Sequence, residues 1–220
     1  MLHVVTGPLY SDLEDAIAEH LQSFRVQHPV EPLTIIVPSH YARLRLQWFL
    51  CTQRNLSLFH VHVLTFFQLT LQLVEEQGQL IFHVIRSDNF FREWIHHLMR
   101  RRKTAFPHLA GLTKTPGGWT TLWNTIKDLK NGAVDAQFAR EALWHNYRDV
   151  DPICQSVFML YDWYCEEQNR FQIFDCDDIA KIAKASVDSS TFLSQQSQIW
   201  YYGFYDLTQV QLDLFHAIAR

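Results

Sequence analysis

The residues around Gly7 stand where a phosphate-binding loop would follow the first strand of an α/β protein. Such a loop has the pattern Gly-x-x-x-x-Gly-Lys-Ser/Thr, in which glycines allow close backbone approach, the lysine binds phosphates and the hydroxyl holds Mg²⁺. Gly7 fits the first position, but Asp12, Leu13 and Glu14 occupy the positions of the second Gly, the Lys and the Ser/Thr. Carboxylates repel a polyphosphate, so the sequence predicts no ATP hydrolysis at this loop.

A second group of residues could bind nucleic acid. Residues 92–103 contain five basic residues, Arg92 and Arg100-Arg101-Arg102-Lys103, against the single acid Glu93, a net charge of +4. Aromatic and imidazole side chains interleave with them: Phe90, Phe91, Trp94, His96 and His97. Basic groups neutralise phosphates and aromatic rings stack on bases, which suits single-stranded nucleic acid. A solvated helix end, stabilised by the helix dipole, is the alternative interpretation of Arg100–Lys103.

Other chemistries find little support in the residue pattern. The 12 histidines are dispersed, and no His or Cys spacing indicates zinc. Asp175, Asp177 and Asp178 lack the glycine and distal glutamate of a calcium loop, and N-capping of a helix at 176–187 accounts for them better. We therefore expect no metal site and no bound cofactor.

Composition places the chain among globular proteins of a reducing compartment. It has 220 residues, of which 48% are hydrophobic and 19% charged, enough to bury a sizeable core. The four cysteines contain no Cys-x-x-Cys pair, and neither a signal peptide nor an apolar run long enough for a membrane helix is visible, so we expect a cytoplasmic protein. The net charge of −4 provides no global basic field, so any DNA contact must come from a local patch.

The elements that would position these residues alternate between strands and helices. Short apolar or β-branched runs predict buried strands at 2–6, 33–37, 59–64 and 199–202. Amphipathic spacing predicts helices at about 9–24 and 210–218, a helix from Thr65 to about Glu76, and another capped by Ser39. Parallel strands need such crossover helices, so we expect an α/β sheet covered on both faces.

The strand signal disappears between about Phe82 and Ala185. Periodic apolar positions there predict helices around Trp119–Leu129, Ile153–Tyr164 and Ile179–Ala183. We therefore expect an α/β domain formed by residues 1–81 and 186–220, with a helical insertion at 82–185.

Several short segments occur in the order in which a known family carries them. The main ones are Ile36-Val37-Pro38-Ser39, Val63-Leu64-Thr65-Phe66, Phe174-Asp175-Cys176-Asp177-Asp178-Ile179 and Gly203-Phe204-Tyr205-Asp206-Leu207-Thr208. Over nearly all of its length the chain thereby resembles the N-terminal helicase-like region of the AddB component of AddAB-type ATP-dependent helicase–nucleases. It is similar, more distantly, to the first motor domain of UvrD-like superfamily 1 helicases. The resemblance implies a P-loop-NTPase-like parallel sheet flanked by helices, with an all-helical insertion corresponding to motor domains 1A and 1B.

The resemblance also marks two degenerate positions. Tyr202 and Gly203 stand where active helicases carry the Mg²⁺-binding Asp and the water-activating Glu. Without those carboxylates there is neither a metal ligand nor a general base, so we expect no catalytic residue. AddB-type proteins commonly continue into a nuclease domain with a PD-(D/E)xK site, which these residues do not contain.

The resemblance implies a role in double-strand-break repair and recombination. The domain would guide single-stranded or double-stranded DNA and dock against a UvrD-like, AddA-type motor subunit. Candidate DNA contacts are Thr65, Phe66, Arg100, Arg101, Arg102 and Lys103, the first two because the matching segment of active helicases lies against single-stranded DNA. The alternative is a stand-alone protein-interaction module on a degenerate NTPase scaffold, without DNA binding.

Overall fold

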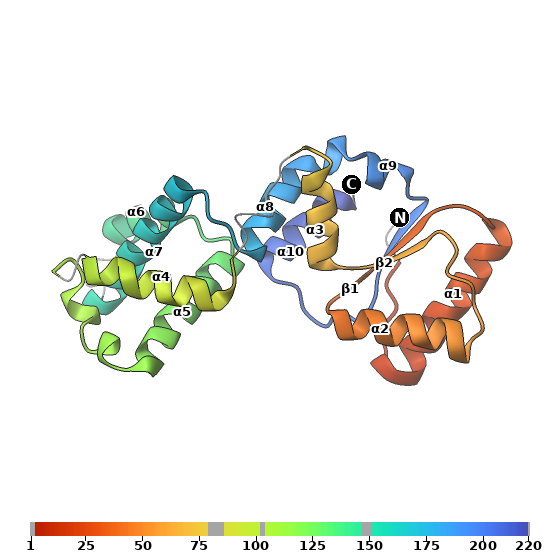
Figure 1. Ribbon diagram of the computed structural model, residues 1–220, viewed down its shortest axis with the longest axis horizontal. Coiled ribbons are helices and arrows are strands. Elements are labelled where there is room, and N and C mark those ends of the chain that lie inside the picture. The colour runs from red at the N-terminus through yellow and green to blue at the C-terminus, as the bar shows by residue number, and fades with distance from the viewer. Residues whose placement is uncertain (1–2, 79–85, 102–103, 147–150, 220) are drawn as a thin grey trace. The chain divides into compact units, whose positions relative to one another are not determined.

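The chain divides into two compact units, described separately below (Figure 1). The computed structural model describes residues 3–78, 86–101, 104–146 and 151–219. Unit 1 comprises residues 1–79, 180–207 and 211–220, and unit 2 comprises residues 80–179 and 208–210. No helix within the described residues is both long enough and apolar enough to cross a bilayer.

Unit 1 is built on a parallel sheet of three strands in the order β2-β1-β3. The strands are β1 (Leu33–Val37), β2 (Val61–Thr65) and β3 (Gln198–Tyr201). In register, Leu33 lies opposite Val61 on one side and Gln198 on the other. All five residues of β1 are buried, as expected for a central strand of a covered parallel sheet.

Helices flank this sheet, and those between consecutive strands lie in the crossover connections. They are α1 (Glu14–Gln27), α2 (His40–Trp48), α3 (Phe66–Glu75), α8 (Cys176–Ser186), α9 (Thr191–Gln195) and α10 (Gln209–Ile218). Figure 1 shows α1 and α2 on one side of the strands and α3 on the other. Leu21 and Phe24 of α1 and Leu46 of α2 pack with Leu33 and Ile35 of β1 in one core. The predicted α/β class with a helix-covered parallel sheet is confirmed at this level.

Two predicted helix starts are confirmed by their caps. The Ser39 hydroxyl accepts a hydrogen bond from the Ala42 amide at 3.1 Å, which satisfies a free N–H at the start of α2. Thr65 forms a capping box with Gln68: its hydroxyl accepts from the Gln68 amide at 3.2 Å, and its own amide donates to Gln68 Oε1 at 2.9 Å.

The strand predicted at 2–6 is wrong over residues 3–6, which have no regular secondary structure and are exposed; Leu2 lies outside the described residues. A strand is stabilised by ladder hydrogen bonds, and none of the three strands of the sheet pairs with these residues. The helix predicted from Leu9 also starts later. Leu9–Leu13 is an irregular π-type turn in which Ser11 has a φ of 75°, and α1 begins at Glu14. The strand predicted from Phe59 begins at Val61, because His60 has a φ of 52° that extended backbone cannot adopt.

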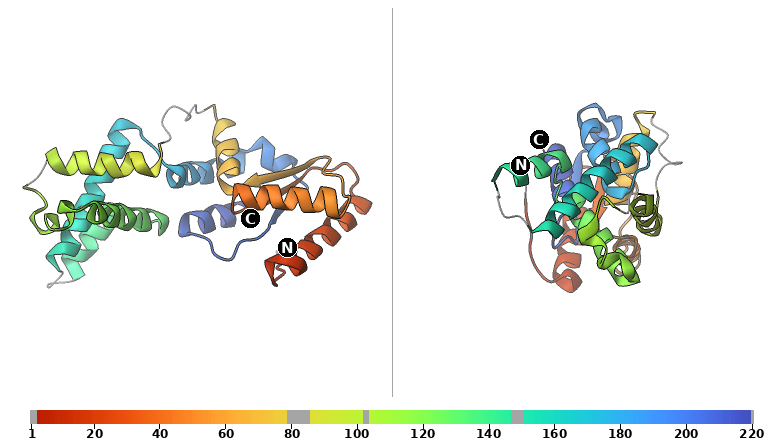
Figure 2. Two further views of the ribbon diagram at one scale, coloured as in Figure 1. Left: turned by 60° about the horizontal axis from the view of Figure 1, so that its bottom comes forward. Right: turned by 90° about the vertical axis from the view of Figure 1, so that its left-hand side faces the viewer.

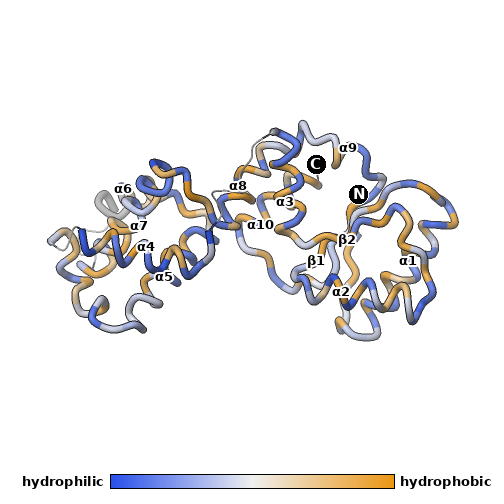
Figure 3. Tube along the Cα trace, viewed as in Figure 1, coloured by the Kyte–Doolittle hydropathy of each residue, from blue (hydrophilic) through white to orange (hydrophobic). Residues whose placement is uncertain are grey.

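Unit 2 is helical. Its helices are α4 (Asp88–Arg101), α5 (Pro116–Asn131), α6 (Ala136–Asn146) and α7 (Pro152–Phe171), and the first turn of α8 belongs to it. Figures 1 and 2 show α4 and α5 side by side. The core is aromatic: the Phe91 and Trp123 rings stack at 5.5 Å, and Tyr164 packs edge-on to Phe91 at 6.1 Å. In Figure 3 hydrophobic and hydrophilic stretches alternate along these helices, as expected when each buries one face.

Short helical turns complete the two units. In unit 1 a π-type turn follows α2 at Phe49–Gln53, and a 3₁₀ turn at Val187–Ser189 follows α8. In unit 2 two 3₁₀ turns, Pro107–Leu109 and Leu112–Lys114, connect α4 to α5.

Candidate functional site

The loop that follows Gly7 forms a crowded turn in unit 1. The Leu13 amide donates to the Pro8 carbonyl at 3.1 Å, and the Ser11 hydroxyl donates to Asp12 Oδ1 at 2.7 Å. A Cβ added to Gly7 would lie 3.3 Å from Asp12 Cβ. The Asp12 side chain therefore lies beside Gly7. A phosphate-binding loop would have backbone N–H groups and small residues at this place.

Glu14, the acid at the hydroxyl position of the degenerate loop, is bound by an arginine. Its side chain is only 5% exposed, and both carboxylate oxygens accept from Arg45 of α2, from Nε at 2.8 Å and from a terminal guanidinium nitrogen at 3.1 Å. The hydrogen bonds with Glu14 raise the pKa of Arg45 above its ordinary value. Both carboxylate oxygens of Glu14 therefore already have a cationic partner.

Tyr202 and Gly203, which the sequence predicts to be degenerate nucleotide-site positions, follow the carboxyl end of β3. The Tyr202 amide donates to the Ile36 carbonyl at 2.9 Å, which places its ring in the core beneath α1 and α2. Burial, aided by the charge of Glu14, raises the pKa of Tyr202 to about 12. Gly203 has a φ of 78°, and a Cβ there would lie 3.3 Å from Leu9 Cδ1. The structure thus brings together positions that are nearly 200 residues apart in the sequence.

The chemistry of this cluster is that of a neutralised ion pair beside a protonated phenol. One carboxylate faces one guanidinium, and a tyrosine with a pKa near 12 stays neutral at physiological pH. In the described ranges no group of three or more His, Cys, Asp or Glu is placed to hold a metal ion. Sequence reasoning missed Arg45, because a partner 31 residues away on another helix leaves no spacing signal.

The basic patch lies on α4 of unit 2, and Arg102 and Lys103 are outside the described residues. Arg92, His96 and Arg100 recur every four residues and share one face of the helix. Glu93 lies 3.8 Å from Arg92 and 3.7 Å from His96. Arg100 and Arg101 are exposed at the end of the helix.

The aromatic side chains around this patch are distributed differently from the prediction. Phe91 is fully buried, and Phe90 and Trp94 pack against the core of unit 2. Trp119 of α5 instead reaches the α4 face, with its ring 4.4 Å from that of His96. The sequence pattern could not show this, because Trp119 belongs to another helix and also fits the apolar periodicity of α5.

Thr65 and Phe66, two of the predicted DNA contacts, have structural roles within unit 1. The Thr65 hydroxyl caps α3, as described above, and Phe66 is only 8% exposed. The Gln68 side-chain oxygen that completes the cap also accepts from Arg43 of α2 at 3.3 Å. A ring that is buried offers no face to a base in this arrangement.

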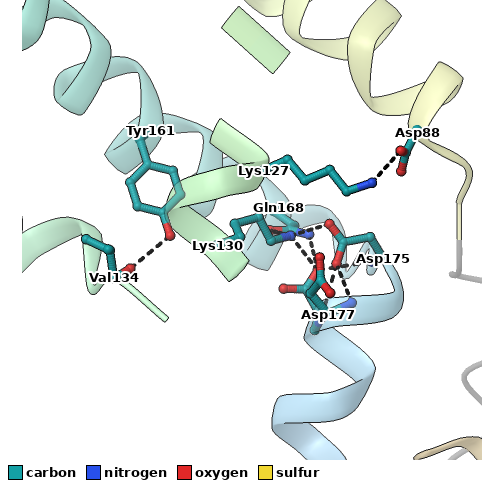
Figure 4. Close-up of polar contacts among 9 residues, drawn as sticks. Asp88, Lys127, Lys130, Val134, Tyr161, Gln168, Asp175 and Asp177 are labelled. Atoms are coloured by element: carbon teal, nitrogen blue, oxygen red, sulfur yellow. Dashed lines mark hydrogen bonds and ion pairs between the residues drawn. The ribbon is translucent and has the colours of Figure 1, made fainter. Parts of the chain in front are cut away.

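A buried polar cluster in unit 2 was not predicted as a unit. Figure 4 shows Lys130 of α5 among the acids at the start of α8. Its Nζ lies 2.5 Å from Asp175 Oδ2 and 2.9 Å from Asp178 Oδ2, and the Gln168 side-chain oxygen is at 3.4 Å. Asp175 Oδ1 also accepts from the amides of Asp177 and Asp178 at 3.0 and 3.1 Å, so the predicted N-capping is confirmed.

The ionisation of this cluster is set by burial and by Lys130. Burial raises the pKa of Asp178 to about 6, with the neighbouring Asp175 adding to the effect against the attraction of Lys130. Burial also opposes ionisation of Asp175, but the ammonium group outweighs it and holds the pKa of that carboxyl below its ordinary value. The same carboxylates keep the pKa of Lys130 raised despite its burial. The charges of these groups are paired with one another inside the unit, as in a buried structural ion-pair cluster.

Comparison with known proteins identifies the family. No curated protein matches the chain. The family model described as "ADDB, N-terminal" matches residues 4–220, almost the whole chain. The match spans both units and includes the loop after Gly7, the end of β3 and the helical region. The chain therefore belongs to the AddB N-terminal family, the N-terminal region of AddB-type helicase–nuclease subunits.

Proposed function

We propose that this chain is a non-catalytic, helicase-like domain that guides DNA and docks a motor subunit during double-strand-break repair and recombination. The observation that carries the proposal is the family match over residues 4–220, since AddB-type subunits act together with an AddA-type motor. In this proposal unit 1 is a degenerate P-loop-NTPase-like domain, and the helical region at 82–185 corresponds to the insertion of a helicase motor.

The residues at the proposed degenerate nucleotide site support the proposal that the domain does not hydrolyse ATP. A bound triphosphate would need cationic and N–H groups at the loop after Gly7, and Asp12 and Glu14 put carboxylates there. Arg45, a cation that could otherwise face a phosphate, is held by both oxygens of Glu14. The phenol of Tyr202 and the bare backbone of Gly203 offer neither a carboxylate for Mg²⁺ nor a base for water.

The exposed face of α4 supports DNA contact. Arg92, Arg100 and Arg101 outnumber the two acids of α4, Asp88 and Glu93. Asp88 already pairs with Lys127 of α5, and the rings of His96 and Trp119 meet beside the arginines. Guanidinium groups bind phosphates, and a partly exposed ring can stack on a base of a single strand. Since the whole chain is acidic, this local surface is where we place the DNA.

The test is the salt dependence of single-stranded DNA binding by the full chain. For single strands the slope of log K against log salt is roughly −0.7 per phosphate contact. The double substitution Arg100→Ala and Arg101→Ala should weaken binding and make the slope shallower by about 1.4, measured by fluorescence anisotropy with a labelled oligonucleotide.

A matched control removes two positive charges elsewhere, with Arg170→Ala on α7 and Lys181→Ala on α8, both exposed. We expect this variant to retain the native slope. Equal slopes for the native chain and the Arg100/Arg101 variant would show that the α4 surface does not contact DNA. No binding by the native chain at low salt would favour the protein-interaction alternative.

A further inference from the structure

Helix α2 carries an exposed apolar face that neither unit's core uses. Tyr41, Leu44 and Trp48 are 70%, 51% and 47% exposed, and their spacing of three and four residues puts them on one side of the helix. Tyr10, from the turn before α1, is 56% exposed. These four residues are called the α2 patch below. Across the part of the chain that the structure describes, no other helix presents three large exposed apolar side chains at this spacing.

Arg45 contacts two aromatic rings of the patch, one from α2 and one from the turn before α1. Its guanidinium carbon lies 5.1 Å from the centre of the Tyr10 ring and 5.6 Å from that of Trp48. The two hydrogen bonds to Glu14 fix the guanidinium in place. The two rings are therefore held before any partner arrives, and a preorganised surface loses less entropy on binding.

Charge balance disfavours a nucleic acid as the occupant. The segment around the patch carries three arginines, Arg43, Arg45 and Arg54, and the turn and first residues of α1 carry three acids, Asp12, Glu14 and Asp15. Arg45 pairs with Glu14, and Arg54 pairs with Asp15. No surplus of positive charge is left to neutralise a phosphate backbone, so the patch matches an uncharged apolar surface of a protein.

The size of the patch disfavours a second copy of this chain. An aromatic side chain buries roughly 150–250 Å², so three aromatic residues at about half exposure, with Leu44, offer on the order of 400 Å². Two copies meeting through this patch alone would bury about 800 Å² in total, below the roughly 1,200–2,000 Å² of stable interfaces. A partner that covers the patch and extends beyond it reaches that range, with the aromatic residues and Arg45 at the centre, where energetically dominant residues cluster.

We infer that the α2 patch is the surface on which the AddA-type motor subunit docks. The inference rests on the proposed function for the existence of such a partner, and adds the place and chemistry of the contact. The apposed surface of the motor subunit is apolar and uncharged at its centre, so that it covers Tyr41, Leu44 and Trp48 without having to break the Glu14–Arg45 pair.

The experiment measures binding of the full chain to the purified cognate motor subunit by isothermal titration calorimetry. The test variant combines Tyr41→Ser and Trp48→Ser, and a single Leu44→Arg variant places a charge at the centre of the patch. The control is Phe138→Ser, which removes an aromatic residue of similar exposure from α6. Thermal unfolding of each variant checks that the fold is kept, as expected for exposed positions.

We expect both patch variants to weaken motor binding at least about tenfold, with the Phe138→Ser variant and single-stranded DNA binding unchanged. Native affinity in both patch variants would overturn the inference while leaving the docking proposal intact. No binding by the native chain would overturn the docking part of the proposed function, and the inference with it. Loss of DNA binding, or of a native dimer, in the patch variants with motor binding kept would identify a different occupant.

Discussion

At the scale of single residues, two clusters of the chain pair their charges internally. Glu14, at the start of α1, pairs with Arg45, and Lys130 in unit 2 pairs with Asp175 and Asp178. The first pair is partly open to solvent, whereas the second is almost entirely buried. Burial makes a charge costly unless its partner remains, so the two clusters should respond differently to substitution.

Replacing Lys130 with methionine tests the buried cluster. The change leaves two carboxyl groups in an apolar core without their cation, so we expect the free energy of unfolding to fall by about 3–5 kcal/mol. Urea denaturation followed by tryptophan fluorescence measures the effect, since Trp123 lies in the same core.

Lys127→Met is the matched control one turn away on α5. Lys127 pairs with Asp88 at 2.6 Å, but the two side chains are 37% and 59% exposed, so losing that pair should cost at most about 1 kcal/mol. If the two variants were equally stable, the Lys130 ammonium group would not be needed to stabilise the buried carboxylates.

At the scale of elements, local capping decides where the helices begin. Ser39, Thr65 and Thr115 each accept a hydrogen bond from an amide three residues later, at the starts of α2, α3 and α5. Two of these helices, α2 and α3, directly follow β1 and β2, so the caps also fix where the chain turns away from the sheet. In α5 a second constraint is added by Gly118, which lies against the preceding 3₁₀ turn.

Gly118→Ala should disrupt the start of α5. A Cβ at this position would lie 1.7 Å from the carbonyl oxygen of Leu112, so the backbone of one element must move. We expect a loss of about 1–3 kcal/mol in the free energy of unfolding, measured by urea denaturation.

The neighbouring Gly117→Ala variant is the control, because a Cβ there meets nothing within 4 Å. Alanine restricts the unfolded chain more than glycine does, so this variant should be as stable as the native chain, or more stable by up to about 1 kcal/mol. A Gly118→Ala variant as stable as Gly117→Ala would mean that the close approach to Leu112 is not a constraint in solution.

At the scale of the whole molecule, two cores of different chemistry coexist in one chain. Unit 1 is organised around aliphatic strand residues such as Leu33 and Ile35, and unit 2 around stacked aromatic rings such as Phe91 and Trp123. The residues predicted to form a degenerate nucleotide site all belong to unit 1, whereas the α4 arginines belong to unit 2. The proposed absence of nucleotide binding and the proposed DNA contact therefore concern different units and can be tested separately.

Thermal unfolding of the full chain tests whether the native protein binds a nucleotide. A ligand that binds only the native state raises the melting temperature, by an amount that grows with its concentration over Kd. Because Glu14 occupies Arg45 and carboxylates crowd the loop, we expect no shift with millimolar ATP and Mg²⁺. The control is MgCl₂ with NaCl at matched ionic strength, to separate general salt effects from nucleotide binding. A shift of several degrees with ATP alone would contradict the non-catalytic proposal.

Local signals in the sequence were sufficient for much of the fold. The apolar run Leu33–Val37 is a strand with the predicted ends, and the predicted caps Ser39 and Thr65 start their helices. These features are decided by neighbours within a few residues, through β-propensity and side-chain hydrogen bonds to the backbone. The order of short motifs was likewise enough to identify the family, which the match over residues 4–220 confirms.

The tertiary structure alone decided which side chains meet. The run at residues 3–6 is predicted to be a strand, yet it pairs with none of the three strands of the sheet and is exposed. Arg45 reaches Glu14 across 31 residues, and Lys130 reaches Asp175 across 45, with no periodic pattern to announce either contact. Long-range pairing depends on how helices pack against one another, and the spacing of residues along one helix carries no information about its neighbour.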